Sequence, residues 1–246
     1  MKKKSLIKTS SKAAVWSVGT GLGLVFGPGG SLLGSAFASI LSDVLEKSLS
    51  DKSKSRVQEV YEISKDLITS KLNSGSVPSS NKSLDDLKVL LEGTLLTARD
   101  SYEERKVPLL ANLNSNATFT NTPIENLIET LKLAESLSFR KLCIISVVGK
   151  KLSLSKLPFK EKYKRKAATE TVTGVYFDIL SLSRDGILVQ TEDDNQHLKP
   201  LDYIADIITD RLKLYGLGPT IFNGLQLDNL NQNDKEFKKV YEILKQ

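Results

Sequence analysis

The feature that most constrains this chain is a run of thirty residues without a charge, from Ala13 to Ser42. A run of this length exceeds the roughly 20 apolar residues with which a helix spans a bilayer. Seven of the thirty residues are glycine, however, and the sequence Gly-Pro-Gly-Gly at 27–30 interrupts the run. Because that sequence breaks helices, it predicts two shorter helices, Ala13–Phe26 and Ser31–Leu49, in place of one membrane span.

Glycines recur in this run at close to helical spacing. On one helix face, small residues let two backbones approach closely, as in membrane helix packing. Glycine costs about 1 kcal/mol per helical position in water, so such helices need tight packing or lipid as compensation. We expect a membrane or self-association surface made of these glycines and three aromatic residues: Gly19, Gly23, Gly27, Gly30, Gly34, Trp16, Phe26 and Phe37.

Three interpretations of the N-terminal region stay open. A secretory signal fits the small-x-small sequence Ala36-Phe37-Ala38, although the twelve residues before the apolar run are long for one. A membrane-active helical hairpin fits the five lysines of the first twelve residues, which attract anionic lipid. A glycine-rich hairpin buried in the protein or in an oligomer interface fits the same spacing.

Composition excludes several classes of function. With 40% apolar residues the 246-residue chain can build a core, as one domain with a subdomain or as two small domains. Its single cysteine, Cys143, excludes an intramolecular disulfide and favours a reducing compartment. With one histidine, His197, a His- or Cys-rich zinc site cannot be assembled. We therefore expect a cytoplasmic protein without metal or cofactor, with peripheral contact to the inner membrane as an option.

No catalytic motif survives inspection. Gly149-Lys150 lacks the flanking residues of a phosphate-binding loop, and Gly19-Thr-Gly21 follows no predicted strand, as a dinucleotide fingerprint must. Cys143 lies in an apolar helix and is predicted to be a core thiol. His197 follows an acidic turn, where a solvated side chain is the favoured interpretation. We predict a protein that is not an enzyme and has no small-molecule substrate.

Helix caps and apolar periodicity predict a mostly α-helical fold in three parts. These are a basic, glycine-rich helical segment at 1–73, a helical bundle at 81–137, and a winged-helix-like domain with C-terminal helices at 138–246. The stretch 74–80, rich in serine with a glycine and a proline, is the predicted linker. Asp51, Ser83, Ser101 and Thr122 are the predicted start signals of the helices on either side.

The C-terminal third predicts helices followed by a short β-ribbon. Ser138 caps an apolar helix, Phe139–Val148, and a long helix is expected from Glu161 to Ser183. A strand at 187–191 and a return strand at 197–198 follow. Helices are then expected at 201–215 and 234–244. Helix, helix and β-ribbon is the order of a winged helix-turn-helix.

A basic segment lies in front of what would be the recognition helix. Between Lys150 and Lys166 there are eight cations and one acid, Glu161. Such a segment suits phosphate contacts, although the helix that follows has few Arg, Asn or Gln to read base edges. The residues expected to bind nucleic acid in this alternative are Lys150, Lys151, Lys160, Lys162, Lys164, Arg165 and Lys166.

Three stretches, Tyr102–Asn112, Ala134–Ile145 and Leu180–Ile187, follow a recognisable order. In this the chain resembles a set of uncharacterised bacterial accessory and phage-defence-associated proteins. In that set a glycine-rich N-terminal helical segment precedes a helical body and a winged-helix-like end. The resemblance implies a bacterial or phage setting, and membrane disruption after infection is sensed. It carries no catalytic residues to transfer.

The leading hypothesis is a non-enzymatic accessory protein that acts by membrane association or self-assembly through Ala13–Leu49. Its expected partners are a second copy of the chain, another protein or an anionic membrane surface. The alternatives are a winged-helix nucleic-acid-binding protein that uses 150–166, and a structural subunit of a larger complex.

Overall fold

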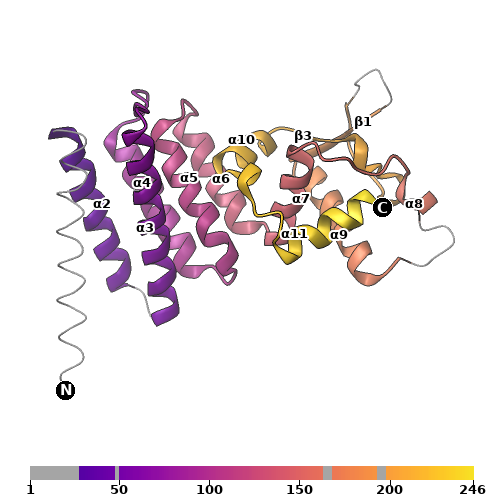
Figure 1. Ribbon diagram of the computed structural model, residues 1–246, viewed down its shortest axis with the longest axis horizontal. Coiled ribbons are helices and arrows are strands. Elements are labelled where there is room, and N and C mark those ends of the chain that lie inside the picture. The colour runs from indigo at the N-terminus through magenta and orange to yellow at the C-terminus, as the bar shows by residue number, and fades with distance from the viewer. Residues whose placement is uncertain (1–27, 48–49, 163–167, 193–197) are drawn as a thin grey trace. The chain divides into compact units, whose positions relative to one another are not determined.

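The computed structural model describes residues 28–47, 50–162, 168–192 and 198–246, and within α2 it describes side chains from Ala36 onward. The described chain is mostly helical, with a small three-stranded antiparallel sheet near the C-terminus, which confirms the predicted fold class at this level (Figure 1). It divides into two compact units. Unit 1 ends at Leu131, and unit 2 is Lys132–Gln246.

Unit 1 is a layer of helices packed side by side (Figure 1). Its elements are α2 (Pro28–Glu46), α3 (Asp51–Asn73), α4 (Leu84–Asp100), the 3-10 helix η1 (Glu104–Lys106), α5 (Val107–Phe119) and the first part of α6 (Ile124–Ser136). Helix α3 contacts both α4 and α5, and α2 contacts α3 and α4. The predicted linker at 74–80 lies inside this unit, where the backbone N–H of Ser79 donates to Thr118 O at 2.9 Å.

Local capping explains where the helices of unit 1 begin. Ser83 caps α4 in a reciprocal capping box with Asp86, which confirms that start signal. The cap of α3 is Ser50, one residue before the predicted Asp51. The prediction that Ser101 opens a helix is wrong, because Ser101 ends α4 and α5 begins only at Val107. Pro108 explains the later start, since proline suits the first turn of a helix and disrupts its interior.

Helix α2 begins at Pro28, inside the predicted Gly-Pro-Gly-Gly break. From Ala36 onward it is amphipathic: Phe37, Ala38, Leu41 and Val44 are buried. Ser39, Ser42, Asp43 and Glu46 are exposed. The first half of the predicted hairpin, Ala13–Phe26, lies outside the described residues.

Unit 2 carries helices around the small sheet. After the end of α6 its helices are α7 (Phe139–Gly149), α8 (Phe159–Lys162), α9 (Glu170–Arg184), α10 (Gly218–Gly224) and α11 (Lys235–Lys245). The strands are β1 (Leu188–Thr191), β2 (Leu198–Lys199) and β3 (Leu212–Leu214), and the 3-10 helices are η2 (Ile204–Asp206), η3 (Thr209–Arg211) and η4 (Leu227–Asn229). Ser138 caps α7 as predicted, and Cys143 is buried in that helix.

The sheet has the order β2-β1-β3, and both pairings are antiparallel. Strand β1 and the return strand β2 confirm the predicted β-ribbon, with Gln190 opposite Lys199. The predicted helix at 201–215 is wrong, because two 3-10 turns and β3 occupy that segment. The β-branched sequence Ile207-Ile208-Thr209 favours extended backbone, and pairing of Leu212 with Gln190 supplies hydrogen bonds that a helix would forgo.

The predicted long helix over 161–183 is also wrong as a single element. The described residues hold a one-turn helix, α8, that ends at Lys162, and a separate helix, α9, that begins at Glu170. Thr169 is the N-cap of α9, since its hydroxyl accepts from the backbone N–H of Val172. A side chain that satisfies a helix N-terminus marks a true start, so the basic segment is not the first turns of α9.

One buried hydroxyl joins three segments of unit 2. Thr209 is fully buried, and its Oγ1 donates to Leu244 O at 2.7 Å at the end of α11. The same oxygen accepts from the backbone N–H of Ser155 at 3.2 Å. A second link is made where the backbone N–H of Phe159 donates to Ile207 O at 3.0 Å. These bonds fix the chain that enters α8 against the η2–η3 loop.

Candidate functional site

The predicted association surface is described only in part. Trp16, Gly19, Gly23, Phe26 and Gly27 lie outside the described residues. Gly30 and Gly34 lie in α2, four residues apart and hence on one face.

Phe37 belongs to the core of unit 1. It is 7% exposed, and α2 packs on α3 and α4 of the same unit. The apolar pattern from Phe37 to Val44 is therefore explained by packing within the chain. A membrane or self-association surface must be sought in the residues that precede it.

Two lysines of the predicted nucleic-acid-binding segment are used inside unit 2. Lys150 Nζ donates to Leu230 O at 3.0 Å and lies 4.7 Å from the centroid of the Phe237 ring. Lys162 Nζ donates to Tyr176 Oη at 2.8 Å. Burial lowers the pKa of Lys150, and it lowers the pKa of Lys162 to about 8.

The other basic residues of that segment are more exposed where they are described. Lys151 and Lys160 are exposed, and Lys160 Nζ lies 3.2 Å from an Asp206 carboxylate oxygen. Lys156, which belongs to the same run, is also exposed. Lys164, Arg165 and Lys166 lie outside the described residues. The structure therefore directs Lys150 and Lys162 inward, toward different helices, and leaves Lys151, Lys156 and Lys160 available on the surface.

Helix α9 is poor in free groups that could read nucleic-acid bases, since polar side chains on it are bonded to α7. Asp178 is engaged by Arg140, whose Nε lies 2.6 Å from its carboxylate, and this hydrogen bond raises the pKa of Arg140. Ser181 accepts from Lys141 Nζ at 2.8 Å. Phe177 is exposed, with 56% of its surface accessible to solvent. Since α9 presents few Arg, Asn or Gln side chains, it has few groups that could form hydrogen bonds with base edges in a major groove.

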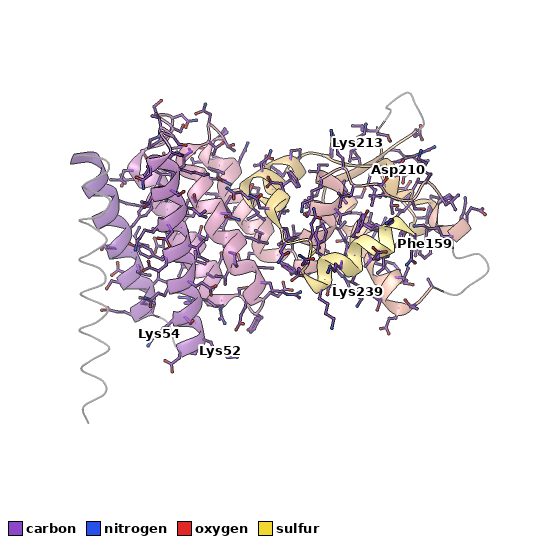
Figure 2. All side chains as sticks on the ribbon, in the orientation of Figure 1. Lys52, Lys54, Phe159, Asp210, Lys213 and Lys239 are labelled. Atoms are coloured by element: carbon purple, nitrogen blue, oxygen red, sulfur yellow. The ribbon has the colours of Figure 1, made fainter. Side chains whose placement is uncertain are left out.

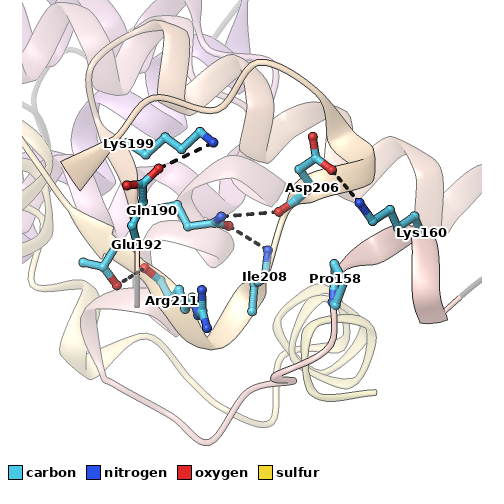
Figure 3. Close-up of a pocket in the computed structure, with 9 residues that line it drawn as sticks. Pro158, Lys160, Gln190, Glu192, Lys199, Asp206, Ile208 and Arg211 are labelled. Carbon is cyan, nitrogen blue, oxygen red and sulfur yellow. Dashed lines mark hydrogen bonds and ion pairs between the residues drawn. The ribbon is translucent and has the colours of Figure 1, made fainter. Parts of the chain in front are cut away.

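A polar pocket lies where the β-ribbon meets the η2–η3 loop (Figure 3). Its volume is about 500 Å³. Three cations, two carboxylates and four uncharged residues line it, from α8, β1, β2 and the η2–η3 loop: Lys160, Lys199, Arg211, Glu192, Asp206, Pro158, Gln190, Thr191 and Ile208.

Hydrogen bonds of the Gln190 side chain fix the η2–η3 side of this pocket. Gln190 is 7% exposed, and its Nε2 donates to Asp206 O at 3.3 Å. Its Oε1 accepts from the backbone N–H of Ile208 at 2.7 Å. At the next position of β1, Thr191 Oγ1 donates to Arg211 O at 3.3 Å. The side chains of two consecutive residues of β1 thus support the η2–η3 loop along its length.

Two ion pairs lie on the pocket wall. Lys160 pairs with Asp206 at 3.2 Å, and Lys199 Nζ lies 3.6 Å from a Glu192 carboxylate oxygen. Each of these four side chains is more than half exposed. Exposed pairs contribute little to stability, so the four charged groups are free to exchange partners.

Sequence reasoning identified one of these pocket cations, Lys160, and missed Lys199, Asp206 and Arg211. The reason is the predicted helix at 201–215, which places Asp206 and Arg211 on a helix surface. The alternation of apolar and basic residues in Leu212-Lys213-Leu214, closed by Gly216, is the signal of a strand that could have corrected this.

Two further properties of the described residues bear on function. No helix in the described ranges is long and apolar enough to cross a bilayer. Within the same ranges, no group of three or more His, Cys, Asp or Glu residues is arranged to hold a metal ion.

Comparison of the chain with protein-family models, with curated proteins and with solved structures finds no significant match in any of the three.

Proposed function

We propose that this is a non-enzymatic protein that acts by membrane association or self-assembly through the residues before α2. One observation assigns this role to the residues before α2 and not to α2 itself: from Phe37 onward, α2 packs its apolar face on α3 and α4. The charge-free residues 13–27 are thus followed at once by a helix that belongs to a folded unit. A force or a contact made by the N-terminal residues would be passed to unit 1 through α2.

The residues before α2 have the composition for such a role. Lys2, Lys3, Lys4, Lys8 and Lys12 precede the apolar stretch. Each basic residue near an anionic bilayer contributes about 1 kcal/mol to binding. Gly19, Gly23 and Gly27 follow at intervals of four, the spacing with which helices pack at short distance. The lysines would therefore contribute to binding of anionic lipid, and the glycines to helix packing, and the two contributions can be tested separately.

The truncation that tests this proposal should end at residue 27. Removing 1–49 would strip Phe37, Leu41 and Val44 from the core of unit 1. Each such side chain contributes about 1.5–3 kcal/mol when buried, so that chain would lose its fold together with its association. A chain that begins at Pro28 keeps the whole of α2.

Flotation with anionic and neutral vesicles then measures membrane association, and sedimentation velocity measures self-assembly. The full chain is expected to float with anionic vesicles or to sediment as an oligomer, and the chain lacking 1–27 is expected to do neither. Equal behaviour of the two chains in both measurements would remove the proposal.

Two sets of substitutions separate the contributions. Replacing the five N-terminal lysines by glutamine should weaken flotation with anionic vesicles. The binding that remains should not depend on salt concentration. Gly19→Leu with Gly23→Leu adds apolar surface but blocks close helix approach. A membrane role predicts that this double variant still floats. A self-assembly role predicts a monomer.

A second candidate function is nucleic-acid binding by unit 2 as a winged-helix-like domain. The observation that favours it is α9 followed by the antiparallel pair β1–β2, with Lys151, Lys156 and Lys160 exposed ahead of α9. The contacts would be made to phosphates, because α9 offers few groups for base readout.

Fluorescence anisotropy with a labelled DNA duplex tests this candidate. The combined variant Lys151→Ala, Lys156→Ala and Lys160→Ala should bind more weakly and with a smaller salt slope. Lys213→Ala is the matched control, since Lys213 is exposed on β3 outside the basic segment (Figure 2). Binding that survives the triple substitution, or that is lost equally in the control, would argue against this candidate.

A further inference from the structure

The pocket at the end of the β-ribbon has the size of a small-molecule site. Ligand pockets occupy roughly 300–1,000 Å³, and this one holds about 500 Å³. It is built by segments that are far apart in the sequence: Lys160 on α8, Lys199 on β2 and Arg211 at the end of η3 (Figure 3). Nothing in the N-terminal proposal requires such a pocket.

The η2–η3 loop that forms one side of the pocket is held in place before any ligand arrives. Both ends of the buried Gln190 amide are occupied by backbone groups of the η2–η3 loop. Pro158, which also lines the pocket, forms a β-bridge with Ile208. Thr209 fixes the same loop to the end of α11. Because these bonds already order the loop, a ligand that binds here does not lose affinity to the entropy cost of ordering it.

The charges favour an anionic group with polar neighbours. Among the lining residues that the structure describes, three cations face two carboxylates, a net charge of 3 − 2 = +1. Lysine and arginine together suit phosphate, to which arginine can donate two parallel hydrogen bonds. An ionised carboxylate accepts hydrogen bonds and donates none. Glu192 and Asp206 therefore suit hydroxyl or amino groups on the rest of the same ligand.

We infer that this pocket binds a small phosphorylated molecule whose remaining part carries hydroxyl or amino groups, with Arg211 and Lys199 on the phosphate. The carboxylates that now pair with Lys160 and Lys199 take up the hydroxyl groups as the ion pairs open. A continuous polyanion fits less well, because Glu192 and Asp206 would repel the next phosphate along the chain.

Isothermal titration calorimetry on the full chain tests this inference, with ribose 5-phosphate and adenosine monophosphate as probes. Adenosine, inorganic phosphate and a single-stranded oligonucleotide are the comparators. At least one phosphorylated probe should bind more tightly than inorganic phosphate and than adenosine. No binding of either probe at millimolar concentration overturns the inference. Inorganic phosphate or the oligonucleotide binding as tightly as the better probe also overturns it.

Substitutions locate the binding. Arg211→Ala and Lys199→Ala should each raise the dissociation constant for the better probe at least tenfold, about 1.4 kcal/mol. Lys213→Ala is the control, because Lys213 is exposed on β3 and does not line the pocket. The side chain of Lys199 is 54% exposed, so its removal leaves the fold intact, and a melting curve verifies this for Arg211→Ala. Unchanged binding in the Lys199 variant would overturn the assignment.

Discussion

At the scale of single residues, Lys162 is a half-buried amine that lies over the ring of a buried tyrosine. Its ammonium group donates to the hydroxyl of fully buried Tyr176, and Phe159 packs on the same ring with centroids 4.5 Å apart. Burial lowers the pKa of Lys162 to about 8. Between pH 8 and the ordinary lysine pKa near 10.4, the unfolded chain therefore holds more protons at this position than the folded chain. Stability rises with pH across that window.

We predict that Lys162 is acylated selectively near neutral pH. With a pKa of about 8, about a quarter of Lys162 is uncharged at pH 7.5, compared with about one in a thousand for an ordinary lysine. A limiting amount of an amine-reactive reagent, followed by peptide mass spectrometry over a pH series, measures this. Exposed Lys151 is the internal reference. Identical pH profiles for the two residues would contradict the prediction.

Two buried hydroxyls are predicted to respond in opposite directions. Thr209→Val removes the bonds to Leu244 and Ser155 and should destabilise unit 2 by about 1–3 kcal/mol. Ser115, fully buried in α5, has a hydroxyl without a hydrogen-bond partner in the described structure. Ser115→Ala should leave unit 1 unchanged or stabilise it by about 1 kcal/mol. Urea unfolding measures the free energy of unfolding of both variants. An equal loss of stability in the two would contradict this prediction.

At the scale of elements, sequence succeeded where a local signal determines the structure. Ser83, Ser138 and the cap before α11, Asp234, each accept backbone hydrogen bonds at the predicted helix starts. Strand β1 was predicted from a β-branched and apolar run that a glycine turn precedes. These features need only a few neighbouring residues, so one sequence is enough to find them.

Sequence failed where pairing with a distant segment determines the structure. The chain from 201 to 215 has helix-like spacing, yet β3 forms there because β1 offers an edge. The same distant pairing creates the pocket, since Gln190 and Thr191 of β1 bind the η2–η3 loop. The nine residues of that pocket therefore had no joint signature in the sequence. The N-terminal residues are a different case, because there the prediction depends on residues outside the described structure.

Close backbone approach around β1 gives a prediction at the level of elements. A Cβ atom on Gly218, the first residue of α10, would clash with the carbonyl oxygen of Ile187. Gly218→Ala should therefore destabilise unit 2 by about 1–3 kcal/mol.

Gly174 is the matched control, because a Cβ there meets only the Arg140 guanidinium at 3.5 Å. In the interior of α9, Gly174→Ala should stabilise the helix by up to about 1 kcal/mol. Thermal melting of the two variants measures the contrast. A Gly218 variant as stable as the parent would show that α10 can shift away from Ile187.

At the scale of the whole molecule, the two units carry different tasks in this account. Unit 1 holds α2 in its core and so connects the N-terminal residues to a folded body. Unit 2 holds a preformed polar pocket. The charge-free run that dominates the sequence thus continues into α2, which begins at Pro28 and buries Phe37, Ala38 and Leu41 in the core of unit 1.

We predict that a chain of residues 28–246 keeps the cooperative melting of both units, because it keeps the whole of α2. Removal of 1–49 should in contrast abolish cooperative melting of unit 1, because Val44 is 1% exposed and leaves with Phe37 and Leu41. Circular dichroism on heating measures both. A fully folded product from the longer deletion would mean that α2 is dispensable for the core.

The most direct test of the central claim uses the single tryptophan of the chain, Trp16, which lies within the N-terminal apolar stretch. Its fluorescence can be recorded on the unlabelled full chain, at rising protein concentration and with added anionic vesicles. Association through these residues predicts a shift of the emission to shorter wavelength and protection from acrylamide quenching in at least one of the two series. Emission typical of a solvated indole, unchanged and fully quenchable in both series, would contradict the account.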